Sequence, residues 1–176
     1  MKGLITIDQL NKEQVLEIFS RAQENLTRLR NSNQSSIKNN NHSKTKTLIN
    51  LFFENSTRTR TSFEISAHLL DFKIINFDVN NSSIKKGESI IDTAKTINAM
   101  NPNFIVTRHE SSGFAKLFSK NIDCHLINAG DGTNEHPTQA LTDAFTILQH
   151  KKTLTGIKIA ICGDILHSRV AHSNIK

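Results

Sequence analysis

Short apolar runs alternate with helix-patterned segments along the chain. The runs are rich in Ile, Leu, Val and Phe and cover residues 47–53, 73–78, 104–109, 124–129 and 158–163. Between them, apolar residues recur at every third or fourth position, as on one face of a helix. Such alternation is typical of β–α–β units, whose right-handed crossovers set the strands parallel in one sheet. We therefore predict an α/β fold in which a parallel sheet carries helices on both faces.

The helical segments have recognisable starts and ends. Apolar periodicity predicts helices over residues 8–30, 61–70, 90–100, 113–120 and 137–149. Asp8 is expected to cap the first of them, and Pro137 occupies the first position of the last. Residues 31–46 are polar and rich in Asn and Ser, so a mobile surface loop is predicted there.

The last apolar run bears on the number of domains. Residues 158–163 have the composition of a central strand, yet no further apolar run follows that could pair with it. Residues 164–176 supply only a loop and the beginning of a helix, which is too little to bury a core. We therefore expect residues 1–150 to form one domain and residues 151–176 to be the truncated start of a second α/β domain.

The turn after the first apolar run carries an unusual set of polar groups. Residues 54–60 contain three hydroxyl side chains and two guanidinium groups. A helix N-terminus adds unpaired N–H groups and a partial positive charge. Together these groups predict a socket for a phosphate-like dianion. Taken alone, the turn has an equally good structural explanation, in which Ser and Thr only cap the helix and the arginines lie in solvent.

Polar residues that suit a binding site follow the other predicted strands as well. They are the loop at residues 82–86, Arg108, His136, Gln139 and Arg169. The carboxyl ends of parallel strands lie along one edge of a sheet, and ligands bind there. We therefore expect these residues and the turn at 54–60 to form one active site.

Charge and composition limit the classes of partner. A net charge of +6 and a pI near 9.5 suit an anionic ligand. The Lys and Arg residues are dispersed and Trp and Tyr are absent, which argues against a nucleic-acid partner. No apolar run approaches the ~18 residues of a membrane span, and the first residues lack the apolar stretch of a signal peptide. We predict a cytoplasmic protein that does not enter a membrane.

The sequence lacks the motifs of several common catalytic sites. It has no Gly-x-x-x-x-Gly-Lys-Ser/Thr loop, no Gly-x-Ser-x-Gly elbow and no metal-ligand spacing of His and Cys. Cys124 and Cys162 lie in apolar runs and are predicted to be buried thiols, neither a disulfide nor zinc ligands. We expect no metal and no cofactor, and a transfer reaction driven by positioning and electrostatics.

Four stretches resemble the aspartate and ornithine carbamoyltransferase family. They are Phe-Glu-Asn-Ser-Thr-Arg-Thr-Arg at residues 53–60, Lys-Lys-Gly-Glu at 85–88, Val-Thr-Arg-His at 106–109 and the run at 128–143. That last run contains Asn-Ala-Gly-Asp-Gly and His-Pro-Thr-Gln, which resemble the aspartate branch, whereas the ornithine branch typically has His-Pro-Cys-Gln. His172 departs from the family, because relatives often carry Arg at that position.

The resemblance implies transfer of the carbamoyl group of carbamoyl phosphate to the α-amine of L-aspartate, a step of pyrimidine biosynthesis. The residues implied to hold the phosphate are Ser56, Thr57, Arg58 and Thr59. Thr59, Arg108 and His136 would donate hydrogen bonds to the carbonyl oxygen as it becomes an oxyanion. Gln139 would accept a hydrogen bond from the carbamoyl NH2 group.

The resemblance also implies an aspartate site and an assembly. Lys86 and Arg169 would bind aspartate, with Lys86 and either Ser82 or Ser83 reaching into the site of a neighbouring subunit. The expected assembly is a homotrimer, to which a regulatory chain can bind. Two alternatives stay open from the sequence: an ornithine-type or other carbamoyltransferase, and a non-catalytic phosphate-binding module.

Overall fold

The computed structural model describes residues 3–31, 45–79, 82, 84 and 87–176. In chain order the elements are β1 (Gly3–Leu4), the 3-10 turn η1 (Ile7–Gln9), α1 (Lys12–Asn31), β2 (Thr47–Phe52), α2 (Thr57–Leu69), β3 (Lys73–Phe77), α3 (Ile90–Ala99), β4 (Phe104–His109), α4 (Phe114–Ser119), β5 (His125–Asp131), α5 (Pro137–Lys151) and α6 (Arg169–Ile175). Residues 32–44 of the loop predicted at 31–46 lie outside the described residues, as do Ser83 and Lys86, whereas Asn31 belongs to α1.

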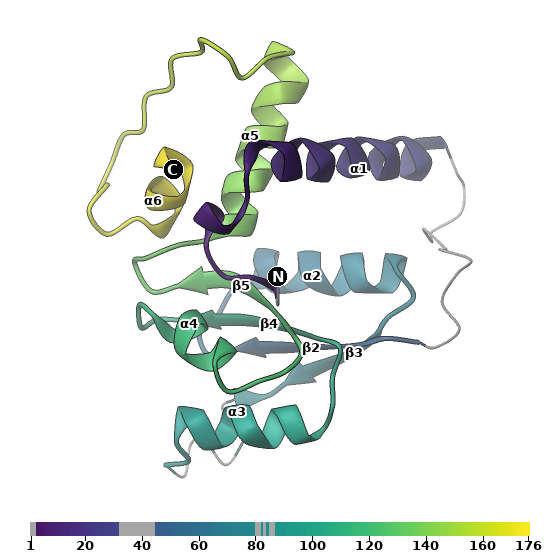
Figure 1. Cartoon of the computed structure of the whole chain (residues 1–176), viewed down its shortest axis with the longest axis vertical. Coiled ribbons are helices and arrows are strands. Elements are labelled where there is room, and N and C mark those ends of the chain that lie inside the picture. The colour runs from purple at the N-terminus through teal and green to yellow at the C-terminus, as the bar shows by residue number, and fades with distance from the viewer. Residues whose placement is uncertain (1–2, 32–44, 80–81, 83, 85–86) are drawn as a thin grey trace.

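The described strands form one parallel sheet with the order β1-β5-β4-β2-β3. α3 and α4 cover one face, and α1, α2 and α5 lie on the other (Figure 1). β2 pairs with β4 on one side and with β3 on the other, so the strand that leads into the polar turn is central. The predicted α/β fold, with helices on both faces of a parallel sheet, is confirmed.

Each face of the sheet has its own apolar cluster. On the side of α3 and α4, Leu51 and Ile105 of adjacent strands are fully buried beside Phe118 of α4. On the other side, Val106 packs with Ala67 of α2. Neighbouring residues of a strand point to opposite faces, so Ile105 and Val106 serve different clusters. Strands buried on both faces explain why the apolar runs are nearly continuous.

The predicted strand at residues 158–163 is not formed. This segment belongs to the long connection between α5 and α6, which arcs away from the sheet (Figure 1). Ile159 is 61% exposed and Ile161 39% exposed. A strand needs a neighbour for its backbone N–H and C=O groups, and none lies beside these residues within the described chain. The prediction of a buried Cys162 is wrong for the same reason, because its thiol is exposed, whereas Cys124 is half-buried.

The N-terminus also differs from prediction. Asp8 lies in η1 and does not cap a helix; α1 begins at Lys12. Asn11 takes the capping role, since its Oδ1 accepts from the backbone N–H of Gln14, whose Oε1 accepts from the N–H of Asn11, both at 2.9 Å. β1 was missed because two residues carry no periodic signal. It pairs with β5 and so brings the N-terminal segment to the edge of the sheet.

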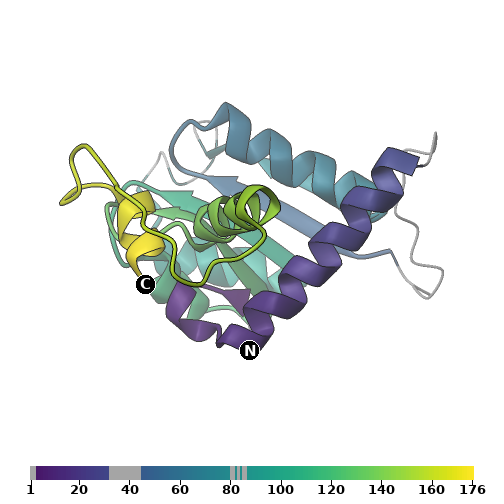
Figure 2. The same cartoon turned by 90° about the horizontal axis from the view of Figure 1, so that it is seen from above.

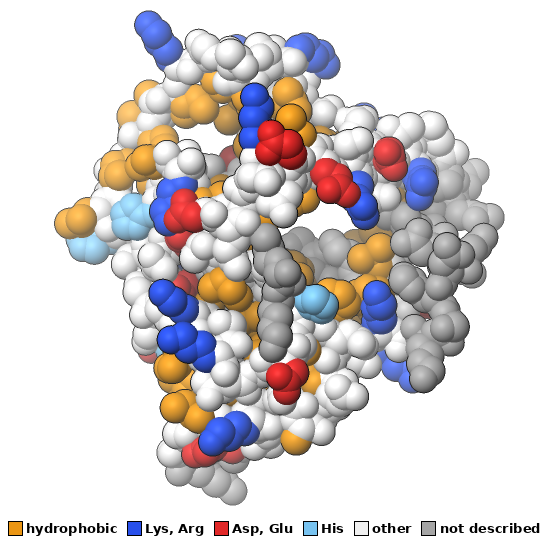
Figure 3. Space-filling model, in the orientation of Figure 1, with side chains coloured by type: hydrophobic (Ala, Val, Ile, Leu, Met, Phe, Trp, Pro, Cys, Tyr) orange, Lys and Arg blue, Asp and Glu red, His pale blue; other side chains and the backbone are white. Residues whose placement is uncertain are grey.

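The surface mixes charges of both signs. Lys and Arg side chains alternate with Asp and Glu over the face seen in Figure 3. None of the described helices is long and apolar enough to cross a membrane. On the face seen in Figure 3, the Lys and Arg side chains do not form one continuous stripe.

Candidate active site

An open cleft of about 1170 Å³ lies at the carboxyl ends of β2, β4 and β5. Its walls are the first turn of α2, the end of β4, the turn between β5 and α5, and the start of α6, which packs beside α5 (Figure 2). Eight of the predicted site residues line this cleft: Ser56, Thr57, Arg58, Thr59, Arg108, His136, Gln139 and Arg169. Ser82 of the predicted loop at 82–86 does not line it, and its Oγ donates to the carbonyl oxygen of Val79 at 2.8 Å. Lys86 lies outside the described residues. Residues up to 113 positions apart in the chain, from Ser56 to Arg169, thus meet at one edge of the sheet.

The N-terminus of α2 opens into the cleft without a side-chain cap. Ser56 has the extended backbone of an N-cap residue, with φ −156° and ψ 94°, but its side chain makes no capping hydrogen bond. The first turn contains no acidic residue. The N–H groups of a first helical turn have no partner within the helix, so those of α2 are free to bind an anion in the cleft. The alternative that Ser56 only caps the helix is not supported.

Two arginines that line the cleft share one carboxylate, that of Glu54. Oε1 of Glu54 lies 2.8 Å from Nε of Arg108 and 2.5 Å from Nη2 of Arg169. Arg108 also donates from Nη1 to the carbonyl oxygen of Ala129 at 3.2 Å. Its Nε has no aligned hydrogen-bond acceptor among the described residues, so the contact with Glu54 is one of charge. One carboxylate leaves an excess of positive charge in the cleft.

Burial and a neighbouring cation both act on Arg108. Burial lowers the pKa of Arg108, and the Arg169 guanidinium lowers it further, while Glu54 opposes both effects. The group still keeps its charge at neutral pH, because the pKa of an arginine ordinarily lies far above neutrality. Gly130 makes the close approach of the two guanidiniums possible. A Cβ there would lie 3.1 Å from Cζ of Arg169 and 3.2 Å from Nη1 of Arg108, and the φ of +131° already disfavours any other residue.

His136 is a buried, neutral imidazole at the start of α5. It is 5% exposed, and its backbone N–H donates to Oγ of Ser173 at 2.7 Å. Burial lowers the pKa of His136 to about 4, and the charges of Arg108 and Arg169 contribute to the shift. At neutral pH the ring therefore carries one hydrogen, and it can donate a hydrogen bond without adding a charge. Oγ1 of Thr138 lies 3.3 Å from Nδ1, a contact that favours the hydrogen on Nε2 when the hydroxyl donates.

Gln139 is oriented by its own helix. Its Nε2 donates to Oδ1 of Asp143 at 2.8 Å, and the other oxygen of Asp143 accepts from Asn174 of α6 at 2.9 Å. This hydrogen bond occupies one of the two hydrogens of the amide nitrogen. Gln139 lines the cleft, and its carbonyl oxygen Oε1 is a hydrogen-bond acceptor.

Sequence reasoning missed two of the residues that shape the site. Glu54 was seen only as part of the motif, because its partners Arg108 and Arg169 follow it by 54 and 115 positions. Ser173 gave no signal at all, since one serine in a short helix is unremarkable. The sequence does hold one signal for Glu54. An acidic residue directly before a predicted anion-binding turn would repel the anion unless a cationic side chain pairs with it, which predicts an ion pair for Glu54. Among the described residues, no group of His, Cys, Asp and Glu is arranged to hold a metal ion.

Acid should destabilise this chain through His136. The folded-state pKa of about 4 lies below the ordinary value of 6.5. The folded state therefore binds fewer protons than the unfolded state between these pH values. The contribution of neutral His136 to the free energy of unfolding is fully present above pH 6.5 and is lost as the pH falls through 4. The loss is of the order of 3 kcal/mol at most. Urea unfolding at pH 7, 6, 5 and 4 should show a shallower pH dependence for His136→Gln than for the unmodified chain, because carboxylates contribute equally to both. Identical slopes would contradict a buried neutral imidazole.

Comparison with known proteins places this site in a family. Residues 2–149 match the family model for "Aspartate/ornithine carbamoyltransferase, carbamoyl-P binding domain". The chain belongs to the aspartate/ornithine carbamoyltransferase family.

The individual relatives come from the aspartate branch. The chain is 51% identical over 174 residues to the aspartate carbamoyltransferase catalytic subunit of Rhodospirillum rubrum, a match that covers 99% of this chain and 53% of the relative. A Trypanosoma cruzi aspartate transcarbamoylase in complex with carbamoyl phosphate and aspartate superposes with a TM-score of 0.88 at 29% identity, over 99% of this chain and 56% of that one. The M. jannaschii catalytic subunit gives a TM-score of 0.82 at 40% identity, over 99% and 56%. The chain thus spans about half the length of the curated relatives it matches.

Proposed function

We propose that this chain carries the carbamoyl-phosphate site of an aspartate carbamoyltransferase. The enzyme would transfer the carbamoyl group from carbamoyl phosphate to the α-amine of L-aspartate, giving N-carbamoyl-L-aspartate and phosphate in pyrimidine biosynthesis. The observation that carries the proposal is the uncapped N-terminus of α2 with Arg58, which faces Arg108 and His136 across one cleft. The similar catalytic subunits of Rhodospirillum rubrum and M. jannaschii support the aspartate branch.

The phosphate is assigned to the first turn of α2. Ser56, Thr57 and Thr59 offer hydroxyl donors there, and the N–H groups of the turn offer backbone donors. Arg58 adds a guanidinium, which suits two phosphate oxygens at once. The helix dipole places a partial positive charge at the same point.

The carbamoyl group is assigned to the space between Thr59 of α2 and the residues that follow β4 and β5. Thr59, Arg108 and His136 donate to its carbonyl oxygen, while Oε1 of Gln139 accepts from its NH2 group. The amine of aspartate attacks the carbamoyl carbon, and the carbonyl oxygen takes up negative charge as the C–N bond forms. The C–O bond to phosphate then breaks, and inorganic phosphate leaves with the proton that the amine loses. Each donor at the oxyanion is expected to contribute ~10²–10³ in rate.

A neutral His136 fits this role better than a charged one. Burial first of all lowers the pKa of His136 to about 4, and Arg108 and Arg169 contribute to this shift, because an imidazolium beside them would add a third cation. The neutral ring donates one hydrogen bond and needs no counter-ion. The two arginines then supply the positive charge that faces the substrates, while His136 supplies a hydrogen bond.

The aspartate side of the site is proposed to involve a second domain. Arg169 at the start of α6 would bind a carboxylate of aspartate, and Lys86, outside the described residues, would bind from a neighbouring subunit. Residues 1–150 would form the carbamoyl-phosphate-binding domain and residues 151–176 would begin the aspartate-binding domain. We further propose a cytoplasmic homotrimer with shared sites, to which a regulatory chain can bind. The family resemblance of residues 82–88 supports the sharing.

Binding and turnover should separate when the chain is tested alone. The 176-residue chain is expected to bind phosphate weakly and to show no carbamoyl transfer, because turnover needs both substrates held in reacting geometry. A chimera in which this chain replaces the matching half of the Rhodospirillum rubrum catalytic subunit should restore transfer. Calorimetry with phosphate and a colorimetric assay for N-carbamoyl-L-aspartate measure the two properties. Robust turnover by the chain alone would contradict the division into domains, and an inactive, folded chimera would contradict the proposed function.

A further inference from the structure

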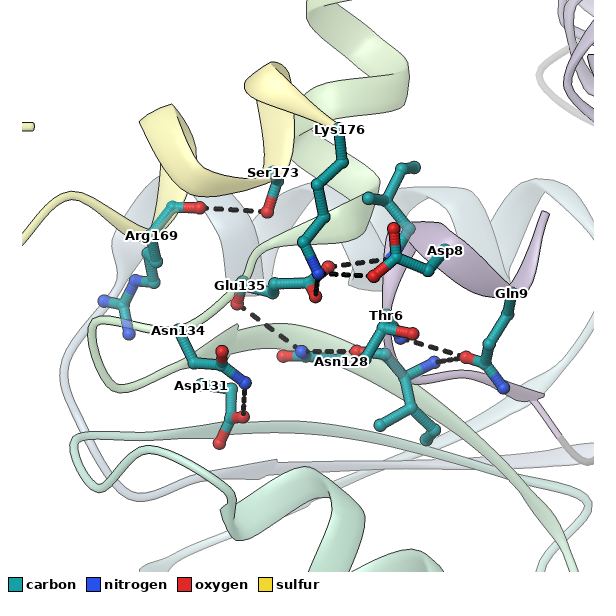
Figure 4. Close-up of polar contacts among 12 residues, drawn as sticks. Thr6, Asp8, Gln9, Asn128, Asp131, Asn134, Glu135, Arg169, Ser173 and Lys176 are labelled. Carbon is teal, nitrogen blue, oxygen red and sulfur yellow. Dashed lines mark hydrogen bonds and ion pairs between the residues drawn. The ribbon is translucent and has the colours of Figure 1, made fainter. Parts of the chain in front are cut away.

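A buried carboxylate stands directly before His136 in the chain. Glu135 is 2% exposed, and its Oε2 accepts a hydrogen bond from the backbone N–H of Ile7 at 2.8 Å. Its Oε1 lies 2.7 Å from Nζ of Lys176, at the end of α6 (Figure 4). The carboxylate is thus held by the N-terminal segment on one side and by α6 on the other.

The backbone of Glu135 is held as well. Its carbonyl oxygen accepts from the backbone N–H of Asp131 at 3.0 Å and from Nδ2 of Asn128 at 3.4 Å. Asn128 is fully buried and also donates to the carbonyl oxygen of Ile5 at 2.8 Å. These contacts tie β5, the N-terminal segment and the turn before His136 into one unit (Figure 4). The turn has no freedom to shift unless one of these contacts opens.

Lys176 balances the negative charge of the Glu135 carboxylate with its ammonium group. In the described part of the chain, it forms the only ion pair of Glu135, and its ammonium also contacts Oδ2 of Asp8. A buried carboxylate that loses its cation is strongly destabilised, so the turn would have to open and let water reach Glu135. Asp8 is 60% exposed, so its own pairing with Lys176 needs no such compensation.

We propose that Glu135 and Lys176 are positioning residues for His136, which rests on the function proposed above. Their ion pair fixes the turn between β5 and α5 and so holds the imidazole at the carbonyl oxygen of the carbamoyl group. Lys176 is the residue at the C-terminal end of α6, whereas His136 stands at the N-terminal end of α5. The pair therefore makes the placement of an oxyanion donor depend on the docking of α6 against the N-terminal segment.

Removal of the ion pair between Glu135 and Lys176 should weaken binding of the carbamoyl part of the ligand but not binding of its phosphate part. The phosphate socket is built on α2, which is anchored by Ala67 in the core and does not contact Glu135 through any described hydrogen bond. The carbamoyl group faces His136, whose position depends on the turn. A general loosening of the fold would weaken both halves, whereas a loss of positioning weakens only the second.

The test compares two ligands on the 176-residue chain by titration calorimetry. Inorganic phosphate reports on the α2 socket, and phosphonoacetamide, a stable analogue with an amide in place of the carbamoyl group, reports on both halves. Lys176→Gln and Glu135→Gln should each weaken phosphonoacetamide binding about five- to tenfold, the loss expected for one hydrogen bond. Phosphate affinity should stay within about twofold, and Lys176→Arg should restore the analogue's affinity. Arg21→Gln, which removes an exposed ion pair with Glu17 on α1, serves as the matched control.

Each outcome decides one question. Should Glu135→Gln fail to fold, Lys176→Gln carries the test, because the lysine side chain is 36% exposed and lies at the end of its helix. Unchanged analogue binding in a folded Lys176→Gln, or equal weakening of both ligands, would overturn the positioning role while leaving the proposed function intact. An unmodified, folded chain that binds neither ligand would overturn the proposed function, and the inference with it.

Discussion

Replacing Arg58 by Ala should weaken carbamoyl phosphate binding and lower the rate of carbamoyl transfer by at least ~10²-fold, as expected for a lost electrostatic donor at a reacting group. Arg58 is exposed to the cleft at the first turn of α2, where the helix lacks a side-chain cap. No other side chain in the described part of that turn brings a positive charge into the cleft. Binding is measured by calorimetry on the chain itself, and the rate on the Rhodospirillum rubrum chimera.

The same turn offers a matched control for Arg58. Arg60 is also exposed, but it pairs with Glu64 at 3.4 Å and does not line the cleft. Arg60→Ala removes the same charge and should change phosphate affinity and the transfer rate by less than about threefold, because an exposed charge outside the site is screened by solvent. Equal losses in both variants would show that net charge, and not the socket at α2, governs binding.

The fold was predictable because its determinants are local. Strands that are buried on both faces give continuous apolar runs, and the β4 bounds predicted from residues 104–109 match the structure. The approximate place of the site followed too, since the carboxyl ends of parallel strands meet at one edge. Ser56, Arg108 and His136 could therefore be grouped without knowing any contact between them.

The remaining features depend on contacts between distant residues, which local sequence does not encode. The composition of residues 158–163 favours a strand, but a strand forms only where a neighbour supplies hydrogen bonds, so those residues stay irregular and exposed. The pairing of Glu54 with Arg169 spans 115 positions, and that of Glu135 with Lys176 spans 41. Asp8 was a plausible cap by type, yet the helix starts four residues later, at Lys12.

Substrate choice should strongly favour L-aspartate over L-ornithine. Arg169 lines the cleft, and among the residues that the structure describes, Glu54 is the one carboxylate that pairs with both this guanidinium and that of Arg108. A dicarboxylate is attracted by this excess of positive charge, whereas the ammonium side chain of ornithine is repelled and leaves the arginine unpaired. The chimera should therefore carbamoylate L-aspartate with a kcat/KM at least ~10³-fold above that for L-ornithine.

The choice between the two amines is measured by the products formed. N-carbamoyl-L-aspartate and citrulline are separated and quantified after incubation with carbamoyl phosphate and each amino acid in turn. Because the second half of the chimera also contributes to specificity, Arg169→Gln provides the test of this chain's own part. It should lower kcat/KM for aspartate while leaving phosphate affinity unchanged. Efficient citrulline formation, or an Arg169→Gln variant with unaltered aspartate kinetics, would contradict the assignment of Arg169.

The most direct test of the site is a crystal structure of the chain with phosphonoacetamide bound. The account predicts one ligand in the cleft at the carboxyl ends of β2, β4 and β5. Its phosphonate should lie within hydrogen-bonding distance of the first turn of α2 and of Arg58, and its amide oxygen should be directed at Arg108 and His136. An empty first turn of α2 at saturating ligand, or a ligand bound elsewhere on the chain, would contradict the claim that this cleft is a carbamoyl-phosphate site.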